Sequence, residues 1–292
     1  MKKLFTLLLV LMMATALVAC GDGDSSAPDN NDSGQSDQDN GNGADLGEVT
    51  VDEQVLVDQD GVIIKAVALD DSWLGPELKV YIENNSDESI TVQARNTSVN
   101  GFMVDPTFSP EVMPDKKAND AITFSDSEFE RYGIETITDI ELNFLVFNSD
   151  TWDEIFFSDL VTVETSAAGS YTQEYDTSGD VVYDDQGMTI IYKGMTDDSI
   201  FGPGIRFYLE NNSDEPLTVQ VRNVSVNGFM IEPTFSPEIM PGKKALADAT
   251  FFDSDFEDNG IETVTEIELN FYIFHTDTWD SVAETPSITI TP

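Results

Sequence analysis

The chain has 292 residues, enough for one large or two ordinary domains, and its 13 Lys and Arg against 56 Asp and Glu give a formal net charge of −43. Nucleic-acid phosphates repel such a protein, so we expect no nucleic-acid partner. The single Cys and single His exclude a disulfide scaffold and a Cys/His zinc site, and we expect neither a metal nor a cofactor.

Residues 1–19 have the pattern of a secretory signal. Lys2 and Lys3 precede an apolar run, Leu4–Val18, that is short for a membrane span. The run ends in Leu17-Val18-Ala19-Cys20, which resembles a bacterial lipobox. This resemblance implies cleavage before Cys20, diacylation of its thiol, and attachment to the bilayer at the extracytoplasmic face of the bacterial cell membrane. An ordinary signal peptide with an accidental Cys is the alternative.

The segment after Cys20 has the composition of a tether. Residues 21–47 are rich in Asp, Gly, Asn and Ser, and Leu46 is their only large aliphatic residue. Such a segment buries too little apolar surface to offset its chain entropy. We therefore predict a lipidated Cys and a disordered acidic linker over residues 20–47, which would space the folded part away from the membrane.

The rest of the chain is one domain-sized sequence written twice. Asn84–Glu88 recurs as Asn211–Glu215, 127 residues later, and Asp58–Thr165 matches Asp185–Pro292 without a gap. This period is far longer than that of a solenoid, so each copy should be a complete domain with its own core. The predicted organisation is copy 1 at 48–165, a linker at 166–179 and copy 2 at 180–292.

Within each copy, apolar and polar residues alternate along short segments. Every second residue is apolar in 77–83 and again in 204–210, which is typical of half-buried strands. We predict further strands in copy 1 at Val62–Leu69, Ile90–Ala94, Ala121–Ser125, Asp139–Phe147 and Leu160–Glu164, with a weak edge strand at Gln54–Asp58.

Turn and helix signals separate these strands. Asn100-Gly101 and Asn227-Gly228 predict type I′ hairpins, because both central positions need positive φ. Ser125–Gly133 and Phe252–Gly260 each predict a short helix that ends before a Gly. The fold class that follows is all-β, with two tandem immunoglobulin-like β-sandwich domains, and a closed barrel is the structural alternative.

The strand-and-turn runs of copy 1 also carry a resemblance. Gly75–Ser86, Thr91–Asn96 and Ser98–Gly101 are similar to segments of the uncharacterised immunoglobulin-like surface lipoproteins of Gram-positive bacteria, and both copies show it. The resemblance implies a surface lipoprotein with sandwich domains. It implies no activity, substrate or site residue.

A proline-spaced loop is the first candidate for ligand binding. Residues 98–118 carry Pro106, Pro110 and Pro114, and 225–245 repeat this spacing. Each proline removes a hydrogen-bond donor and fixes φ, so we expect a stiff connection without helix or central strand. The candidate ligand-binding residues are its apolar side chains Phe108, Met113, Phe235 and Met240. The alternative is that these side chains plug the end of each sandwich.

Other side chains admit both a binding and a packing interpretation. Trp152 and Trp279 lie in a repeated Asp-Thr-Trp-Asp and could stack on a sugar or close a sandwich end. Trp73 is replaced by Ile200 in copy 2, an apolar exchange that suggests packing. Arg95 and Arg222 are expected in cross-strand ion pairs, His275 at a strand end without a special role, and Asp70-Asp71-Ser72 as a weak calcium candidate.

These observations predict a membrane-anchored extracytoplasmic lipoprotein that acts as a binding or spacer module and is not an enzyme. Its ligand would be an unknown protein or glycan. The alternatives are a solute-binding lipoprotein of a transporter, a calcium-dependent adhesin, and a secreted hydrolase or inhibitor. A solute-binding lipoprotein normally has two α/β lobes, and the chain lacks the expected alternation of strands with long helices.

Overall fold

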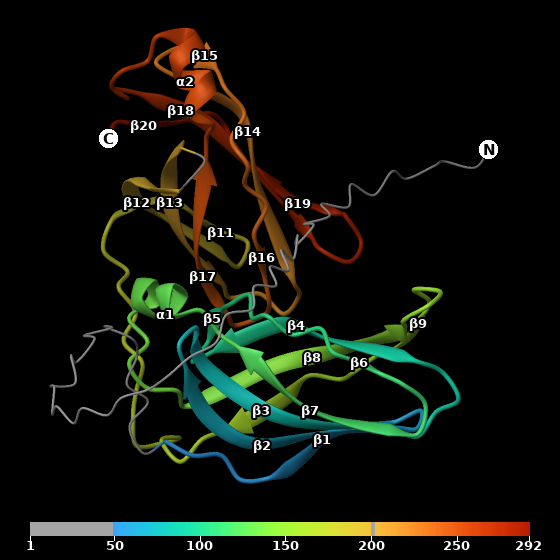
Figure 1. Ribbon diagram of the computed structural model, residues 1–292. Coiled ribbons are helices and arrows are strands. Elements are labelled where there is room, and N and C mark those ends of the chain that lie inside the picture. Colours follow the sequence, from blue (N-terminus) through green and yellow to red (C-terminus); the bar gives the residue numbers. More distant parts are fainter. Residues whose placement is uncertain (1–48, 200–201) are drawn as a thin grey trace, which may run out of the picture. The chain divides into compact units, whose positions relative to one another are not determined.

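The period-two alternation of the sequence appears as antiparallel strands. The computed structural model describes residues 49–199 and 202–292, and these residues form strands, turns and two short helices (Figure 1). The predicted all-β fold is confirmed. The signal sequence, Cys20 and the predicted tether lie outside the described residues.

Copy 1 is built from two antiparallel sheets that enclose one core. The first has the strand order β1-β2-β3-β7, and the second places β10, β8 and β4 side by side, with β5 and β6 on β4 and β9 on β8. The strands are β1 (Gln54–Gln59), β2 (Val62–Ser72), β3 (Gly75–Asn84), β4 (Ile90–Val99), β5 (Phe102–Met103), β6 (Glu111–Val112), β7 (Lys116–Thr123), β8 (Asp139–Asn148), β9 (Glu154–Phe157) and β10 (Val161–Glu164).

Copy 2 repeats this pattern. One sheet contains β11-β12-β13-β17, and the other has the order β15-β14-β18-β19, with β16 on β14 and β20 on β18. The strands are β11 (Asp180–Asp185), β12 (Met188–Ser199), β13 (Gly202–Asn211), β14 (Leu217–Val226), β15 (Phe229–Met230), β16 (Glu238–Ile239), β17 (Lys244–Thr250), β18 (Ile267–His275), β19 (Ser281–Glu284) and β20 (Ile288–Ile290).

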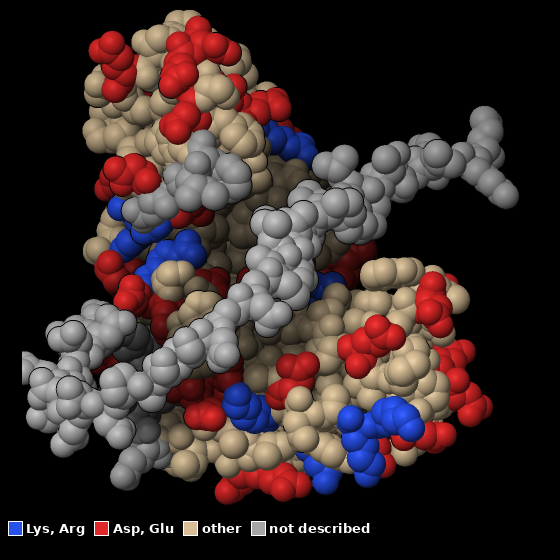
Figure 2. Space-filling view, viewed as in Figure 1, with Lys and Arg blue, Asp and Glu red and all other residues tan. Residues whose placement is uncertain are grey.

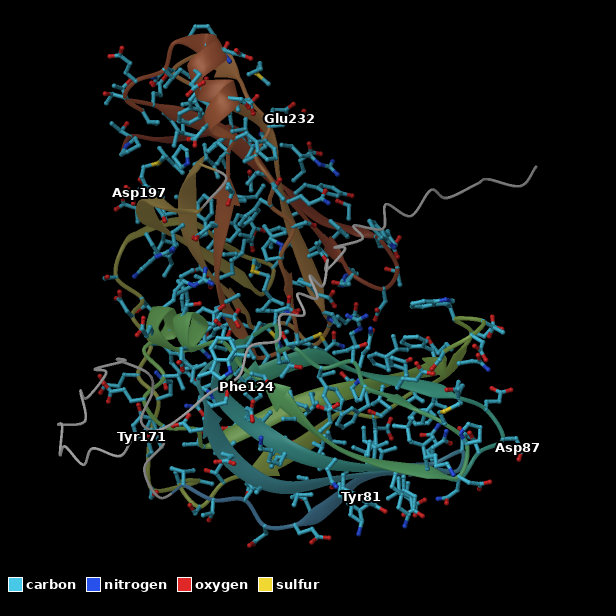
Figure 3. The ribbon with its side chains drawn as sticks, in the orientation of Figure 1. Tyr81, Asp87, Phe124, Tyr171, Asp197 and Glu232 are labelled. Carbon is cyan, nitrogen blue, oxygen red and sulfur yellow. The ribbon has the colours of Figure 1, made fainter. Side chains whose placement is uncertain are left out.

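The alternating residues form a separate hydrophobic cluster in each copy. In β3 the inward residues Leu78, Val80 and Ile82 are buried, and their counterparts in β13 are buried as well. Phe124, labelled in Figure 3, is fully buried in the cluster of copy 1 and packs against Phe129 with the ring centroids 5.8 Å apart. In β3, the residues that alternate with Leu78, Val80 and Ile82 point outward and are more exposed, as a two-residue period requires.

The two copies also share structure at their junction. β5 pairs in parallel with β17 through Phe102 and Lys244, so strands of both copies belong to one ten-stranded sheet. Ile191 and Tyr208 of copy 2 lie in the cluster of copy 1. In the segment between the copies, the Tyr175 hydroxyl donates to the carbonyl oxygen of Asn100 at 2.6 Å. The copies therefore have separate cores but are not independent of one another.

The predicted turns and helices are confirmed. Asn100 and Gly101 have φ of 50° and 81°, and Asn227 and Gly228 have φ of 52° and 85°, as type I′ hairpins need. The helices are α1 (Asp126–Tyr132) and α2 (Asp253–Asn259), each followed by a Gly in the left-handed conformation. Within the described part of the chain, no helix is long and apolar enough to cross a membrane.

Three predictions about the chain need correction. The 127-residue offset fails at the first hairpin, where Asp60-Gly61 corresponds to Gln186-Gly187, because β12 contains an additional irregularity in its pairing with β13. The proline-spaced loop contains the short strands β5 and β6, both paired with β4. Trp73 is 88% exposed rather than packed, because it lies in the turn between β2 and β3.

The burial of Phe108 leads to a stability prediction. Its ring packs against Phe144 in the core of copy 1, with the centroids 6.3 Å apart. Phe108→Ala should lower the free energy of unfolding by about 3–5 kcal/mol, because the substitution leaves a cavity. The matched control is Met113→Ala in the same loop, where an exposed side chain should change stability by less than about 0.5 kcal/mol. Equal effects of the two substitutions in urea unfolding would contradict this assignment.

Candidate ligand-binding site

An outward-facing phenylalanine occupies the same position in both copies. In β8, Phe144 and Val146 point into the core, so the next residue, Phe147, points to the other face of the sheet. Phe274 takes this position in β18. Both rings are nonetheless buried, with exposed fractions of 6% and 3%, although neither belongs to a core cluster. Another side chain must therefore cover them from outside.

That cover is a tryptophan in each copy. The ring of Trp152 stacks on Phe147 with the centroids 5.4 Å apart and the planes 17° apart. Trp279 stacks on Phe274 at 5.2 Å and 15°. Each tryptophan is 72% exposed. One face of each indole therefore contacts protein, and the rest of the ring faces solvent. We call each of these pairs an outer aromatic pair.

The hairpin between β8 and β9 holds Trp152 in place through its backbone. The Trp152 N–H donates to the carbonyl oxygen of Asn148 at 2.9 Å, and the Asn148 N–H donates to that of Asp153 at 2.9 Å. Trp279 and His275 form the same turn in copy 2. Both tryptophans have φ of 65°, a left-handed conformation that is strained for a bulky side chain and costs on the order of 1–3 kcal/mol.

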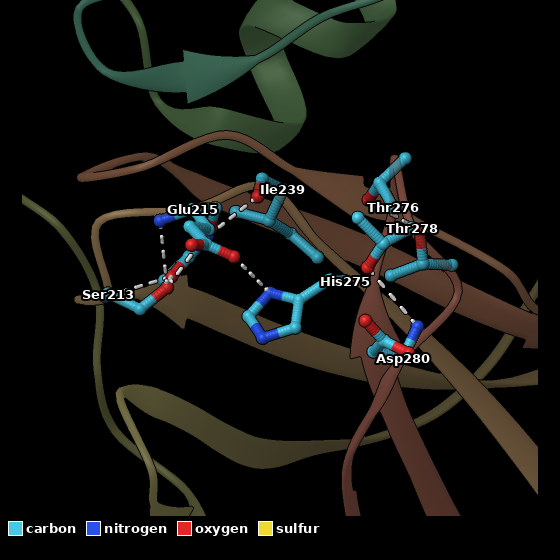
Figure 4. A network of polar contacts seen from close by, with 9 residues as sticks. Ser213, Glu215, Ile239, His275, Thr276, Thr278 and Asp280 are labelled. Carbon is cyan, nitrogen blue, oxygen red and sulfur yellow. Dashed lines mark hydrogen bonds and ion pairs between the residues drawn. The ribbon is translucent and has the colours of Figure 1, made fainter.

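The residue at the end of each long strand joins this hairpin to a neighbouring turn. In copy 1 the Asn148 amide donates to Glu88 Oε2 at 2.9 Å, and its Oδ1 accepts the N–H groups of Asp150 and Thr151. In copy 2 the Nδ1 atom of His275 lies 2.8 Å from Glu215 Oε2, and Figure 4 draws the two side chains facing each other. Different side chains thus contact the equivalent glutamate beside each outer aromatic pair.

Polar side chains flank Phe147 and Phe274 across the sheet. In copy 1, Thr91 lies directly opposite Glu111 on one side and Phe147 on the other. In copy 2, Thr218 lies between Glu238 and Phe274 in the same way. Directly opposed residues share one face of a sheet, so a hydroxyl and a carboxylate lie in a row with each outer aromatic pair.

Carboxylates dominate the surroundings of both pairs. In copy 1, the segments 85–91, 109–113 and 147–157 contain six acidic residues and no Lys or Arg. One of them, Asp87, lies at a turn (Figure 3). Across the face of the molecule shown in Figure 2, acidic side chains far outnumber basic ones. In copy 2, partial desolvation by neighbouring residues and then the charge of Asp277 raise the pKa of Glu238, although its side chain keeps contact with solvent. The open tryptophans therefore lie in a region of negative potential.

The shift at Glu238 makes stability depend on pH. Its raised pKa means that the folded state holds the proton more tightly than the unfolded chain, whose Glu has a pKa of about 4.3. Ionisation of Glu238 therefore costs stability at neutral pH, and this cost disappears as the pH falls below the unfolded value.

Glu238→Gln should accordingly raise the free energy of unfolding at pH 7 and change it little at about pH 4. Urea unfolding at the two pH values measures the difference. Glu232→Gln, at an exposed site of the same copy (Figure 3), is the matched control. A Glu238→Gln protein that is no more stable than the native chain at pH 7 would contradict the direction of the shift.

The structure separates the four residues predicted to bind a ligand. Phe108 and Phe235 are each 7% exposed and pack edge to face on Phe144 and Phe207, so they match the packing alternative and offer no ring to a ligand. Met113 is exposed, and Met240 is partly buried. The hydrophobic side chains of this loop therefore do not form an exposed aromatic site.

Trp152 and Trp279 are better candidates for ligand binding than the apolar residues of the loop. Closing a sandwich end would have buried them, whereas the hairpin places their rings on the outer face. The signal in the sequence is an apolar residue at an outward strand position, Phe147 or Phe274, followed five residues later by Trp.

Arg222 was expected to form a cross-strand ion pair. Its guanidinium carbon instead lies 3.4 Å from the ring centroid of Tyr272.

Comparisons with known proteins do not assign the chain to a family. No protein-family model matches the chain, and neither does any curated protein. Among solved structures, the YadV chaperone is similar with a TM-score of 0.25 and 10% identity over 80% of this chain and 100% of that chain. An exo-chitosanase, CsxA of Amycolatopsis orientalis, is similar with a TM-score of 0.25 and 12% identity over 74% of this chain and 25% of that chain. At these TM-scores the similarities identify neither a family nor a function.

Proposed function

We propose that the protein is a lipid-anchored extracytoplasmic binding module. Its two immunoglobulin-like domains would each present an outer aromatic pair to a ligand. The observation that carries this proposal is the exposure of Trp152 and Trp279, each 72% open to solvent although stacked on a buried Phe. A rigid aromatic ring that is already held in place loses little entropy on binding.

The backbone of the hairpin supports the same proposal. A Gly would adopt the left-handed conformation at residues 152 and 279 without strain, yet both positions carry the largest side chain available. Strained backbone is concentrated at ligand-binding and catalytic sites, and here it holds the indole over Phe147 or Phe274. Covering the Phe accounts for one face of the indole, and a ligand would account for the other.

The architecture also bears on the rival functions. A two-lobed solute-binding lipoprotein needs strands that alternate with long helices, whereas the described residues contain antiparallel strands and two helices of seven residues each. A ligand cleft between two lobes therefore forms no part of this proposal. Binding occurs on the outer faces of the sheets.

Membrane attachment is the second part of the proposal, and it rests on the sequence alone. The apolar run that ends at Cys20 supplies the signal, and two acyl chains would supply the two membrane contacts that stable anchoring takes. The acidic segment over 20–47 would then separate the binding domains from the bilayer.

Cys20→Ala should abolish acylation, because the chain contains no other cysteine. Metabolic labelling with radioactive palmitate followed by fractionation of cells measures this directly. We expect a labelled membrane-bound native protein and an unlabelled variant that is released or mislocalised. Label that persists in the variant would contradict the assignment of Cys20.

Binding is tested with the chain that begins at residue 48, which contains every described strand and both cores. On an array of glycans and proteins, the ligands of this chain should be lost when Trp152→Ala and Trp279→Ala are combined. Trp73→Ala is the matched control, because Trp73 is also exposed but lies outside the proposed site. It precedes β3, whereas the turn at Glu88 beside the outer aromatic pair follows β3. Ligands retained by the double variant would contradict the proposed site.

A further inference from the structure

The outer aromatic pair of copy 2 is one end of a longer stack of side chains. Tyr272 stacks on Phe274 with the ring centroids 5.4 Å apart, and Phe274 stacks on Trp279. The guanidinium of Arg222 covers the other end of the stack, 3.4 Å from the ring centroid of Tyr272. A cation therefore already lies on one end of this stack, and the end formed by Trp279 is open to solvent.

The open end lies among anionic groups. Asp277 and Asp280 flank Trp279 in the sequence, and Asp150 and Asp153 flank Trp152 in the same spacing. All of these aspartates are exposed. The face of an indole attracts cations, and neighbouring carboxylates strengthen the attraction by their negative potential. The charge of Asp277 also contributes to the raised pKa of Glu238, and a bound cation would reduce that repulsion.

A cation alone would not use the whole indole, which presents a broad flat surface beside exposed carboxylate acceptors. A pyranose ring provides apolar C–H groups for such a surface and hydroxyl donors for such acceptors. The duplication adds a further constraint, because two equivalent sites on one chain give avidity only for a ligand that repeats. A polysaccharide meets this condition.

We propose that the outer aromatic pairs bind a glycan whose sugars carry free amino groups, with a protonated amine near the aspartates and the sugar ring on Trp152 or Trp279. This inference rests on the proposed function and specifies its ligand. The chain has an excess of 43 negative charges over positive ones, which also favours the approach of a polycationic ligand over a neutral or anionic one.

The test compares three probes by isothermal titration calorimetry with the chain from residue 48. The first is a β-1,4-linked glucosamine oligomer, the second is the N-acetylated oligomer of the same length, and the third is oligolysine. Titrations are run at about pH 5.5, where the amine is protonated and most carboxylates remain ionised. We expect the glucosamine oligomer to bind at least about tenfold more tightly than the N-acetylated one, and added salt to weaken its binding.

Two sets of variants identify the groups responsible. Trp152→Leu with Trp279→Leu keeps an apolar cover on the phenylalanines but removes the indoles, and should weaken binding of the glucosamine oligomer about tenfold or more, with thermal unfolding little changed. Asp150→Asn, Asp153→Asn, Asp277→Asn and Asp280→Asn together should remove the preference for the amine. Trp73→Leu should change neither property.

The outcomes separate this inference from the proposed function. Equal binding of both oligomers, lost in the Leu variant, would overturn the requirement for an amine and leave the proposed function standing. The Leu variant could still bind both oligolysine and the glucosamine oligomer. This result would overturn the inference, because net charge alone would explain the binding. Absence of binding to the glucosamine oligomer would also overturn the inference, and the array then decides the proposed function separately.

Discussion

The two faces of strands β8 and β18 determine both the core and the surface of each copy. Alternate residues of β18, from Ile267 to Ile273, fill the hydrophobic cluster of copy 2, so Phe274 must lie on the outer face. A phenylalanine on that face needs cover from outside the core, and the hairpin that follows supplies Trp279 at the cost of a left-handed backbone. Core, turn and candidate site thus follow from one register, and a shift of one residue would exchange the two faces.

Duplication gives the chain two related surfaces that have different surroundings. Phe102 in β5 is buried beside copy 2, whereas its counterpart Phe229 in β15 is 45% exposed. The outer aromatic pairs differ less, since Trp152 and Trp279 have the same φ and the same exposure. The junction between the copies therefore buries the hydrophobic surface around Phe102 of copy 1 and leaves both tryptophans exposed.

Much of this fold could be predicted from the sequence, because the determining interactions are local. Alternation located β3 and β13, Asn-Gly pairs located the hairpins, and a terminal Gly located α1 and α2. The candidate site could not be predicted in the same way. Whether Phe108 or Trp152 is buried depends on which segment packs against it from elsewhere in the chain, and a proline-spaced loop or a Trp in a turn is compatible with either result. The outward position of Phe147 held this information, but only once the core face of β8 was known.

The central claim is that both outer tryptophans are open, and fluorescence of the Trp73→Phe protein tests it directly. The chain has three tryptophans, so the emission of this variant comes from Trp152 and Trp279 alone. We expect emission close to that of tryptophan in water, with nearly all of it quenched by acrylamide. Blue-shifted emission that acrylamide does not quench would show that the rings are covered, and would contradict the claim that both are open.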